Sequence, residues 1–299
     1  MEYRNMSGYL REKYGSRLGK ICIDGGFTCP NRDGSVGVGG CAFCGERGAG
    51  EHIKPSVSIS EQVREHLRCA PGEKKYIAYF QNFTNTYAPV SILRERYDAA
   101  LIDDRIAVLA IGTRPDCINR EVAELISEYK SRVDVWVELG LQTASDEAAS
   151  LMNRGYKTER FLSATELLRA YDIPVVAHIM LGLPGTDEGD AFKTVELVNR
   201  AEVFGVKLHS VYVMRGTALA EMYERGEYRP LEMSEYVRLA ADCIARLNPN
   251  TVVHRITGDC PRGLLVAPTW SEDKNLVISA IRESLSSRGL SQGSLYEKR

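Results

Sequence analysis

The 299-residue sequence has no apolar run of membrane-spanning length and no long apolar segment near its start. These absences argue against an integral membrane protein and against an exported one, so we expect a cytoplasmic protein with no membrane partner. The net charge is only −2 and the pI about 6.3, which gives no protein-wide field for binding polyanions. Internal repeats at solenoid spacing and low-complexity tracts are also missing.

Cysteine is not scarce, but disulfides are not expected. Eight cysteines occur at positions 22, 29, 41, 44, 69, 117, 243 and 260. In a chain of this length without an export signal, buried free thiols and metal ligands are more common than disulfides. Apolar residues make up 44% of the chain and charged residues 26%, an ordinary globular balance. One large α/β domain is therefore expected.

Short apolar segments alternate with amphipathic helical patterns along the first two thirds of the chain. Nearly continuous, β-branched apolar runs are typical of parallel strands that are buried on both faces. The predicted strands cover residues 20–24, 76–80, 106–111, 133–139, 175–181 and 206–213, and the predicted helices 89–101, 119–129, 158–171 and 187–204. Six such βα units over residues 18–215 give either a doubly wound sheet or a curved, incomplete barrel.

The two ends of the chain differ from this central unit. We divide the chain into an N-terminal basic segment (1–17), the βα unit (18–215) and a C-terminal helical extension (216–299), with helices at 234–247 and near 273–286 and a short strand at 251–256. Residues 2–20 carry five basic side chains, two glutamates and three interleaved tyrosines. This composition is compatible with RNA phosphate contact and base stacking, or with a solvated helix that covers the open side of a barrel.

Cys29, Cys41 and Cys44 follow the first predicted strand with the spacing C-x11-C-x2-C. Three thiolates can hold three corners of an iron–sulfur cube and leave the fourth iron open for reaction. A structural zinc site would need a fourth ligand, which would have to be Cys22 or His52. The glycine-rich loop carries neither of the common phosphate-binding motifs, so nucleotide binding by a phosphate loop is disfavoured.

Six blocks along the chain carry a family resemblance. They are G-F-T-C-P-N-R-D-G (26–34), Y-F-Q-N-F-T-N-T-Y-A-P (79–89), G-T-R-P-D-C (112–117), E-L-G-L-Q-T (138–143), H-I-M-L-G-L-P-G-T (178–186) and H-R-I-T-G-D (254–259). Together with the cysteine loop after the first strand, they resemble the radical S-adenosylmethionine (SAM) superfamily. The first cysteine gap is wider than the common C-x3-C-x2-C of that family. The wide gap resembles the branch of the Elongator catalytic subunit, and more closely the YhcC-like group.

The resemblance implies both a fold and a reaction. The fold is a partial (β/α)6 TIM-type barrel closed by C-terminal helices. Cys29, Cys41 and Cys44 would hold a [4Fe–4S] cluster at which SAM is reductively cleaved, and the resulting 5′-deoxyadenosyl radical would abstract a hydrogen atom. A reductant such as flavodoxin or ferredoxin is implied, and the Elongator branch favours tRNA, at the wobble uridine, as substrate. A small-metabolite or protein substrate and a zinc-stabilised binding module remain the alternatives.

By the same resemblance, polar residues at strand ends are the expected SAM contacts. Gln81 and Asn82 would bind the amino group, Glu138 and Gln142 the ribose or amino group, and Arg154 the carboxylate, with His178 on the adenine side. Alternatives are an ordinary turn at Gln81–Asn82, a structural ion pair at Glu138 and a surface position for Arg154. Phe43, directly before the last cysteine, would form an apolar wall beside the cluster. The last predicted strand supplies three catalytic candidates with no assigned role: His209, Tyr212 and Arg215.

Overall fold

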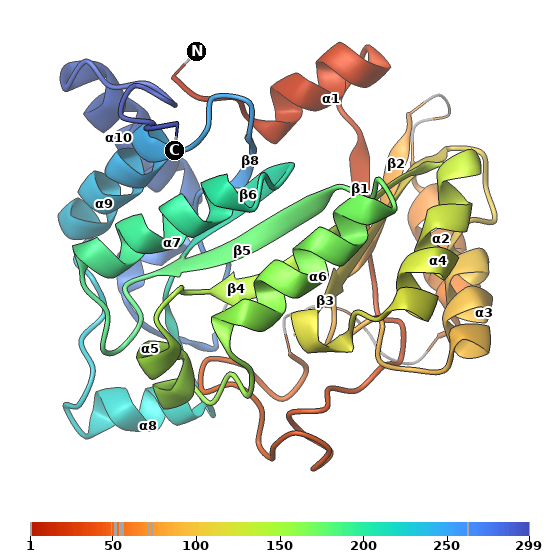
Figure 1. Ribbon diagram of the computed structural model, residues 1–299, viewed down its shortest axis with the longest axis horizontal. Coiled ribbons are helices and arrows are strands. Elements are labelled where there is room, and N and C mark those ends of the chain that lie inside the picture. Colours follow the sequence, from red (N-terminus) through yellow and green to blue (C-terminus); the bar gives the residue numbers. More distant parts are fainter. Residues whose placement is uncertain are drawn as a thin grey trace.

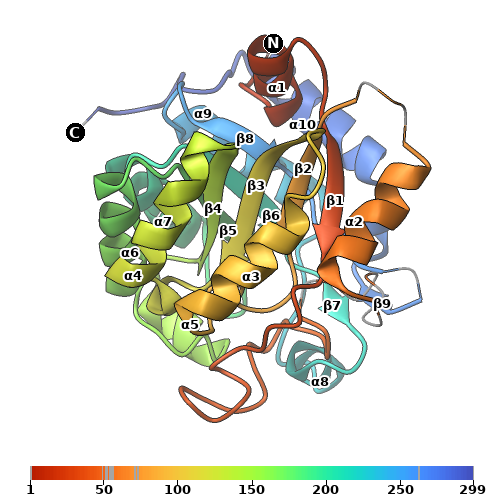
Figure 2. The same ribbon diagram turned by 90° about the vertical axis from the view of Figure 1, so that its right-hand side faces the viewer.

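The computed structural model describes residues 2–298 apart from 49, 51, 52, 54–56, 71, 73 and 262. Its main feature is one sheet of seven parallel strands in the order β1-β2-β3-β4-β5-β6-β8, curled into an open half-barrel (Figures 1 and 2). The strands are β1 (Gly19–Ile23), β2 (Tyr76–Phe80), β3 (Ile106–Thr113), β4 (Asp134–Gln142), β5 (Val175–Leu181), β6 (Gly205–Ser210) and β8 (Val252–Arg255). A small antiparallel pair, β7 (Val213–Met214) and β9 (Leu265–Ala267), lies apart from this sheet. The predicted partial-barrel fold is confirmed.

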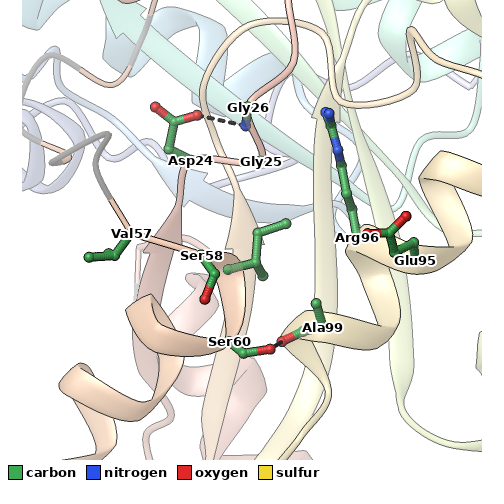
Figure 3. Close-up of a pocket in the computed structure, with 10 residues that line it drawn as sticks. Asp24, Gly25, Gly26, Val57, Ser58, Ser60, Glu95, Arg96 and Ala99 are labelled. Atoms are coloured by element: carbon green, nitrogen blue, oxygen red, sulfur yellow. Dashed lines mark hydrogen bonds between the residues drawn. The ribbon is translucent and has the colours of Figure 1, made fainter.

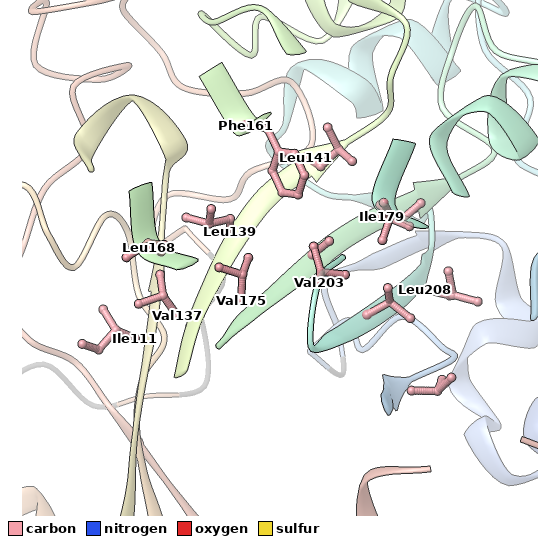
Figure 4. Packing of buried hydrophobic residues seen from close by; sticks show 14 of the residues in the cluster. Ile111, Val137, Leu139, Leu141, Phe161, Leu168, Val175, Ile179, Val203 and Leu208 are labelled. Atoms are coloured by element: carbon pink, nitrogen blue, oxygen red, sulfur yellow. The ribbon is translucent and has the colours of Figure 1, made fainter. Parts of the chain in front are cut away.

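Helices cover the outer face of the sheet. They are α2 (Ile59–Arg68), α3 (Val90–Ala100), α4 (Arg120–Glu128), α6 (Thr158–Ala170), α7 (Glu188–Arg200) and α9 (Met233–Arg246). Figure 4 shows Phe161 and Leu168 of α6 against Leu139 and Leu141 of β4, within the largest buried apolar cluster. Burying such a side chain stabilises the fold by about 1.5–3 kcal/mol. This outer layer holds the strands in register, so their carboxyl ends meet at one edge of the sheet.

The remaining elements are short or terminal. Two helices, α5 (Asp146–Leu151) and α8 (Ala218–Glu224), lie near the carboxyl edge, and α10 (Lys274–Ser287) packs on α9. Short 3-10 helices are η1 (Pro115–Cys117), η2 (Tyr129–Ser131) and η3 (Thr269–Glu272). In the part of the chain that the structure describes, no helix is long and apolar enough to cross a membrane.

The basic N-terminal segment closes one end of the half-barrel. Helix α1 (Met6–Tyr14) begins at Asn5, whose side chain accepts a hydrogen bond from the Gly8 amide. Its Leu10 is buried in a cluster with residues from the amino-terminal halves of the strands, such as Val108 and Trp136. Figures 1 and 2 both place α1 at the opposite end of the sheet from the cysteine loop. Of the two alternatives for this segment, its position matches a covering helix.

Two differences from the expected layout concern the sheet and its outer helices. The predicted strand at 251–256 forms β8, which pairs in parallel with β6 and adds a seventh strand to the six expected. The alternation of strands and helices is interrupted after β6, because the chain first forms β7 and α8. For this reason β8 did not look like part of the same sheet in the sequence. Helix α2 was not predicted, although Ser58 caps it and Val63 and Leu67 are buried on one face.

Candidate active site

Cys29, Cys41 and Cys44 lie on the long loop that follows β1, at the carboxyl edge of the sheet. The loop is fastened to the rest of the fold by its own backbone. The Ala42 amide donates to the carbonyl of Met152 at 2.9 Å, and the Cys44 amide donates to the Cys41 carbonyl at 2.9 Å, closing a turn between the last two cysteines. These bonds position the thiols independently of any bound group.

All three cysteines line one cavity of about 330 Å³ on the inner side of the half-barrel. Its wall is built from strand ends and inward-facing strand residues, as expected for an active site in a barrel of this kind. Of the residues predicted from the sequence, the following line it besides the cysteines: Phe43, Gln81, Glu138, Gln142, His178, His209 and Tyr212. Asn82, Arg154 and Arg215 do not line it.

The local electrostatics favour a thiolate at the triad. The hydrogen bond from Cys44 lowers the pKa of Cys41 to about 7 against the effect of burial, and the guanidinium groups of Arg114 and Arg32 act in the same direction. The same contact, with burial, raises the pKa of Cys44 well above its usual range. Iron and zinc bind the thiolate form, so this site is suited to metal ligation.

A single-ion zinc site is the alternative to a cluster on these thiols. Thiolates that share one zinc lie within about 4 Å of one another, because each is about 2.3 Å from the metal. Among the described residues, no group of three or more His, Cys, Asp or Glu side chains could hold one metal ion. Cys22, one possible fourth ligand, lies in β1 and lines the cavity, while His52 falls outside the described residues. The donor set, three thiols around one shared cavity, fits an iron–sulfur cluster.

Two residues at strand ends have left-handed backbone conformations. Phe83, just after β2, has φ 56° and Gln142, at the end of β4, has φ 61°. Non-glycine residues in this region cost about 1–3 kcal/mol and persist where the surroundings hold them. At Gln142, the Tyr156 hydroxyl holds this conformation. It donates to the Gly140 carbonyl at 2.8 Å and contacts Gln142 Oε1 at 3.2 Å. The turn directs Gln142 into the cavity.

Asn82 points away from the cavity that Gln81 lines. Its amide nitrogen donates to Asp24 Oδ2 at 3.0 Å, and Arg47 donates to the same oxygen at 3.1 Å. Both residues lie beyond the end of β2 at Phe80, and of the two only Gln81 lines the cavity. Asn82 therefore ties the end of β2 to the end of β1, and its contact with SAM stays a prediction.

Arg154 is buried and its guanidinium is fully used by the protein. Its five N–H donors meet five acceptors: the carbonyls of Leu141, Thr143 and Tyr156, Asp146 Oδ1 and Thr158 Oγ1. A guanidinium has no sixth donor for a ligand carboxylate. In this structure Arg154 fixes the turn after β4 and does not line the cavity, so its contact with the SAM carboxylate stays a prediction.

The Arg114 guanidinium, by contrast, lines the cavity. It lies 4.7 Å from the Tyr156 ring centroid, and three of its donors are used, by Asp116 and the Arg154 carbonyl.

Replacing Arg154 with lysine tests this assignment. Lysine offers three donors, so at least two buried acceptors lose their partner, and we expect the free energy of unfolding to fall by about 2–3 kcal/mol. Urea denaturation followed by circular dichroism measures the change, with Arg160→Lys on the exposed side of α6 as the matched control. Unchanged stability together with weaker SAM binding in calorimetry would support the carboxylate role.

Glu138 is the centre of a buried polar network on the inner face of β4. Its Oε2 accepts from Lys207 and from His178 Nε2 at 2.9 Å, and its Oε1 accepts from Trp136 Nε1 at 3.2 Å. Burial opposes its ionisation, but Lys207 and His178 outweigh burial and hold its pKa well below the usual range. This is the ion-pair alternative stated for Glu138, and the carboxylate still lines the cavity.

Lys207, on β6, is a site residue that the sequence interpretation missed. It is buried with Glu138, lines the cavity, and its ammonium also contacts the Tyr79 hydroxyl at 3.2 Å. Burial lowers its pKa to about 8, so it remains protonated at pH 7. A signal for it existed, because Glu138 and Lys207 are opposite charges within predicted strands that are mostly apolar.

The catalytic candidates of the last predicted strand separate in space. His209 lines the cavity, where its Nε2 contacts an Arg255 guanidinium nitrogen at 3.2 Å, and Tyr212 lines it with its hydroxyl 3.4 Å from the Asp259 carbonyl. Burial and Arg255 lower the pKa of His209 well below its usual range, so the ring is neutral at pH 7. Arg215 is exposed and lies beyond β6, because the predicted strand 206–213 ends at Ser210.

A second hollow, of about 300 Å³, lies between the end of β1 and helices α2 and α3 (Figure 3). Asp24 Oδ1 accepts from the Gly26 amide at 2.9 Å, and Ser60 Oγ donates to the Ala99 carbonyl at 3.0 Å. Arg96 lies 4.2 Å from the Phe27 ring centroid. These contacts hold α2 and α3 in place, and we assign the hollow no function.

Fold and site together define a class: a parallel half-barrel with a cysteine triad, in a loop after its first strand, around an inner cavity. A model of the radical SAM superfamily matches residues 29–198, and a model of the radical SAM C-terminal domain matches residues 203–287. The chain therefore belongs to the radical SAM superfamily and is a radical SAM enzyme dependent on a [4Fe–4S] cluster. Membership implies this cluster and SAM as cofactors.

Similar proteins extend over most of the chain. An uncharacterized Bacillus subtilis protein, YtqA, is 38% identical over 99% of this chain and 93% of its own length. Escherichia coli YhcC is 37% identical over 89% of this chain and 87% of its own length. The recognised YhcC-like group is thereby confirmed.

Elongator-related proteins are similar over smaller shares of their own length. A tRNA uridine(34) acetyltransferase of Methanocaldococcus jannaschii is 32% identical over 55% of this chain and 30% of its own. The structure of Methanocaldococcus infernus Elp3 superposes with a TM-score of 0.69 at 19% identity, covering 92% of this chain and 64% of that one. This structural likeness shows a shared fold.

Proposed function

We propose that this enzyme holds its cluster on Cys29, Cys41 and Cys44 and uses SAM to abstract a hydrogen atom from tRNA, at the wobble uridine. When bound, the cluster and SAM supply a reducing electron and a 5′-deoxyadenosyl radical. The observation that carries the cofactor assignment is that the three thiols line one cavity with the strand-end side chains Gln81 and Gln142. A flavodoxin or ferredoxin is the proposed electron donor.

The residues of this chain then have distinct tasks. Phe43 forms an apolar wall between the last two cysteines, which limits water near the triad. Gln81 and Gln142 offer amide donors and acceptors to SAM from the ends of β2 and β4. Glu138 acts as a positioning residue, because its carboxylate holds His178 at 2.9 Å on the neighbouring strand β5.

Support for tRNA comes from relatives rather than from the cavity. The tRNA uridine(34) acetyltransferase matches about half of this chain, and its name gives the uridine at position 34 as its target. The basic N-terminal helix adds no support, since it lies at the opposite end of the sheet from the cysteine loop. The match covers only 30% of the acetyltransferase's own length, so its acetyl transfer is not carried over to this chain.

Two measurements test the proposal, the first its cofactors and the second its tRNA substrate. The anaerobically reconstituted protein with dithionite and SAM is expected to release 5′-deoxyadenosine, and its absence would refute the cofactor assignment. Nucleoside mass spectrometry of tRNA from a strain lacking the gene is expected to show a changed wobble uridine. An unchanged nucleoside profile, in a strain that otherwise modifies this position, would refute the tRNA substrate while leaving the radical chemistry standing.

A further inference from the structure

The cavity carries an excess of positive charge on the strands away from the cysteine loop. Lys20 lies on β1, Lys207 on β6 and Arg255 on β8, and all three line the cavity. Strands β1 and β8 are the two edges of the open sheet, so cations line the cavity from both edges. Lys20 is three residues before the end of β1, about 10 Å at 3.3 Å per residue. Its backbone therefore lies well away from the cysteine loop.

The carboxylates of the cavity do not neutralise these cations. Glu138 is already shared between Lys207 and His178. Asp259 lies 3.5 Å from Arg255 but also 2.5 Å from Lys274, which stands outside the cavity lining. The cavity therefore brings three strand cations, Lys20, Lys207 and Arg255, against two carboxylates, and one of these, Asp259, is shared with Lys274. Like charges held near one another in a partly enclosed cavity create a positive potential that attracts an anion.

Unused hydrogen-bond donors accompany this charge. Within the described part of the chain, Lys20 has no carboxylate partner, and its ammonium lies 5.2 Å from the Tyr79 ring centroid. Arginine only donates, so His209 Nε2 must accept from Arg255, and the histidine proton therefore sits on Nδ1. Lys20, His209 and Arg255 together offer donors of the kind that bind carboxylates and phosphates.

A separate pair of cations stands beside the triad. Arg32 and Arg114 both act electrostatically on Cys41, and both line the cavity on that side. The carboxylate of SAM would bind near the cluster, where these two guanidinium groups lie. The cations on β1, β6 and β8 are therefore in excess of what SAM itself needs.

We propose that Lys20, His209 and Arg255 form the subsite for an anionic group of the substrate, a carboxylate or a phosphate. This inference rests on the proposed function, since it assumes that the cavity also holds the cluster and SAM. It narrows the substrate to molecules that present an anion beside the hydrogen to be removed. Lys207 supports the subsite by adding positive potential while it remains paired with Glu138.

Calorimetric titration of inorganic phosphate and of acetate tests the subsite on the reconstituted enzyme saturated with SAM, without reductant. We expect one probe or both to bind, and the Lys20→Gln/Arg255→Gln variant to bind at least about tenfold more weakly. The charge-conserving Lys20→Arg/Arg255→Lys variant should stay within about threefold of wild type. Arg120→Gln, on exposed α4, is the matched control for a lost positive charge. Should the double variant fail to fold, Lys20→Gln alone answers the question, because the exposed Lys20 loses no ion pair.

The outcomes separate the sources of the anion. Displacement of the probe by unfractionated tRNA assigns the subsite to an RNA phosphate, whereas a probe that tRNA leaves bound assigns it to a small acid. Wild-type enzyme that binds neither probe, or a glutamine variant that binds as tightly as wild type, overturns the inference. Because no turnover is involved, this failure is distinct from a failure to form 5′-deoxyadenosine, which concerns the proposed function.

Discussion

The Cys41→Ala variant is expected to make no 5′-deoxyadenosine from SAM and dithionite. The surroundings of Cys41 lower the pKa of its thiol to about 7, which favours the thiolate form that binds iron. A [4Fe–4S] cluster at this site has three cysteine ligands, and Cys41 is one of them. Removing one leaves two iron corners open and the cluster unstable. Iron and sulfide content after anaerobic reconstitution, and chromatography of the nucleoside product, measure the effect.

Folding of the variant is expected to survive. The loop is fastened through backbone bonds such as the 2.9 Å contact from Ala42 to Met152. The Cys41 side chain adds weak sulfur contacts, one from Asn31 Nδ2 at 3.8 Å and one with Cys44. Cys69→Ala is the matched control, because Cys69 is exposed and does not line the cavity. A Cys41→Ala protein with normal iron content and undiminished 5′-deoxyadenosine formation would contradict the assignment of the triad.

The cysteine triad could be predicted from the sequence because its signal is local. Three cysteines with C-x2-C at the end, directly after an apolar strand, reach one cavity whatever the details of the rest of the barrel. The sheet was predictable for a similar reason: runs such as the fully buried β2 (YIAYF) have few alternatives to a buried parallel strand. The seventh strand was harder to place, since β8 spans only four residues and α8 and β7 separate it from β6.

The residues expected to contact SAM were harder to predict, because their roles depend on the direction in which each side chain points. Gln81 and Asn82 are adjacent, and only the course of the chain after β2 decides that the first lines the cavity and the second binds Asp24. For Arg154, the sequence motif predicts a guanidinium near the site. It does not show how many protein acceptors already bind the donors of that guanidinium. The three carbonyls that accept from it belong to Leu141 at the end of β4 and to Thr143 and Tyr156 beyond that strand, and only the folded structure brings them together.

The Glu138→Gln variant is expected to lower the free energy of unfolding by about 3–5 kcal/mol, which is typical when one partner of a buried ion pair is removed. Glutamine is nearly isosteric with glutamate, so packing stays the same while Lys207 loses its only carboxylate partner among the described residues. Lys207→Met should cost a similar amount, because it leaves the Glu138 charge unbalanced in a buried position. Urea denaturation of the anaerobic proteins provides both numbers.

The combined Glu138→Gln/Lys207→Met variant distinguishes a charge effect from a packing effect. If the pair matters through its charges, the double variant removes both at once and should be less destabilised than the sum of the single variants by at least about 2 kcal/mol. Additive losses would contradict this account and indicate that each side chain is needed for its shape. The exposed Arg94–Glu128 pair on α3 and α4 is the control, and Arg94→Gln should cost less than about 1 kcal/mol. The contrast between the two pairs follows from burial: water screens the exposed charges, whereas the inner face of the half-barrel leaves Glu138 and Lys207 to balance each other.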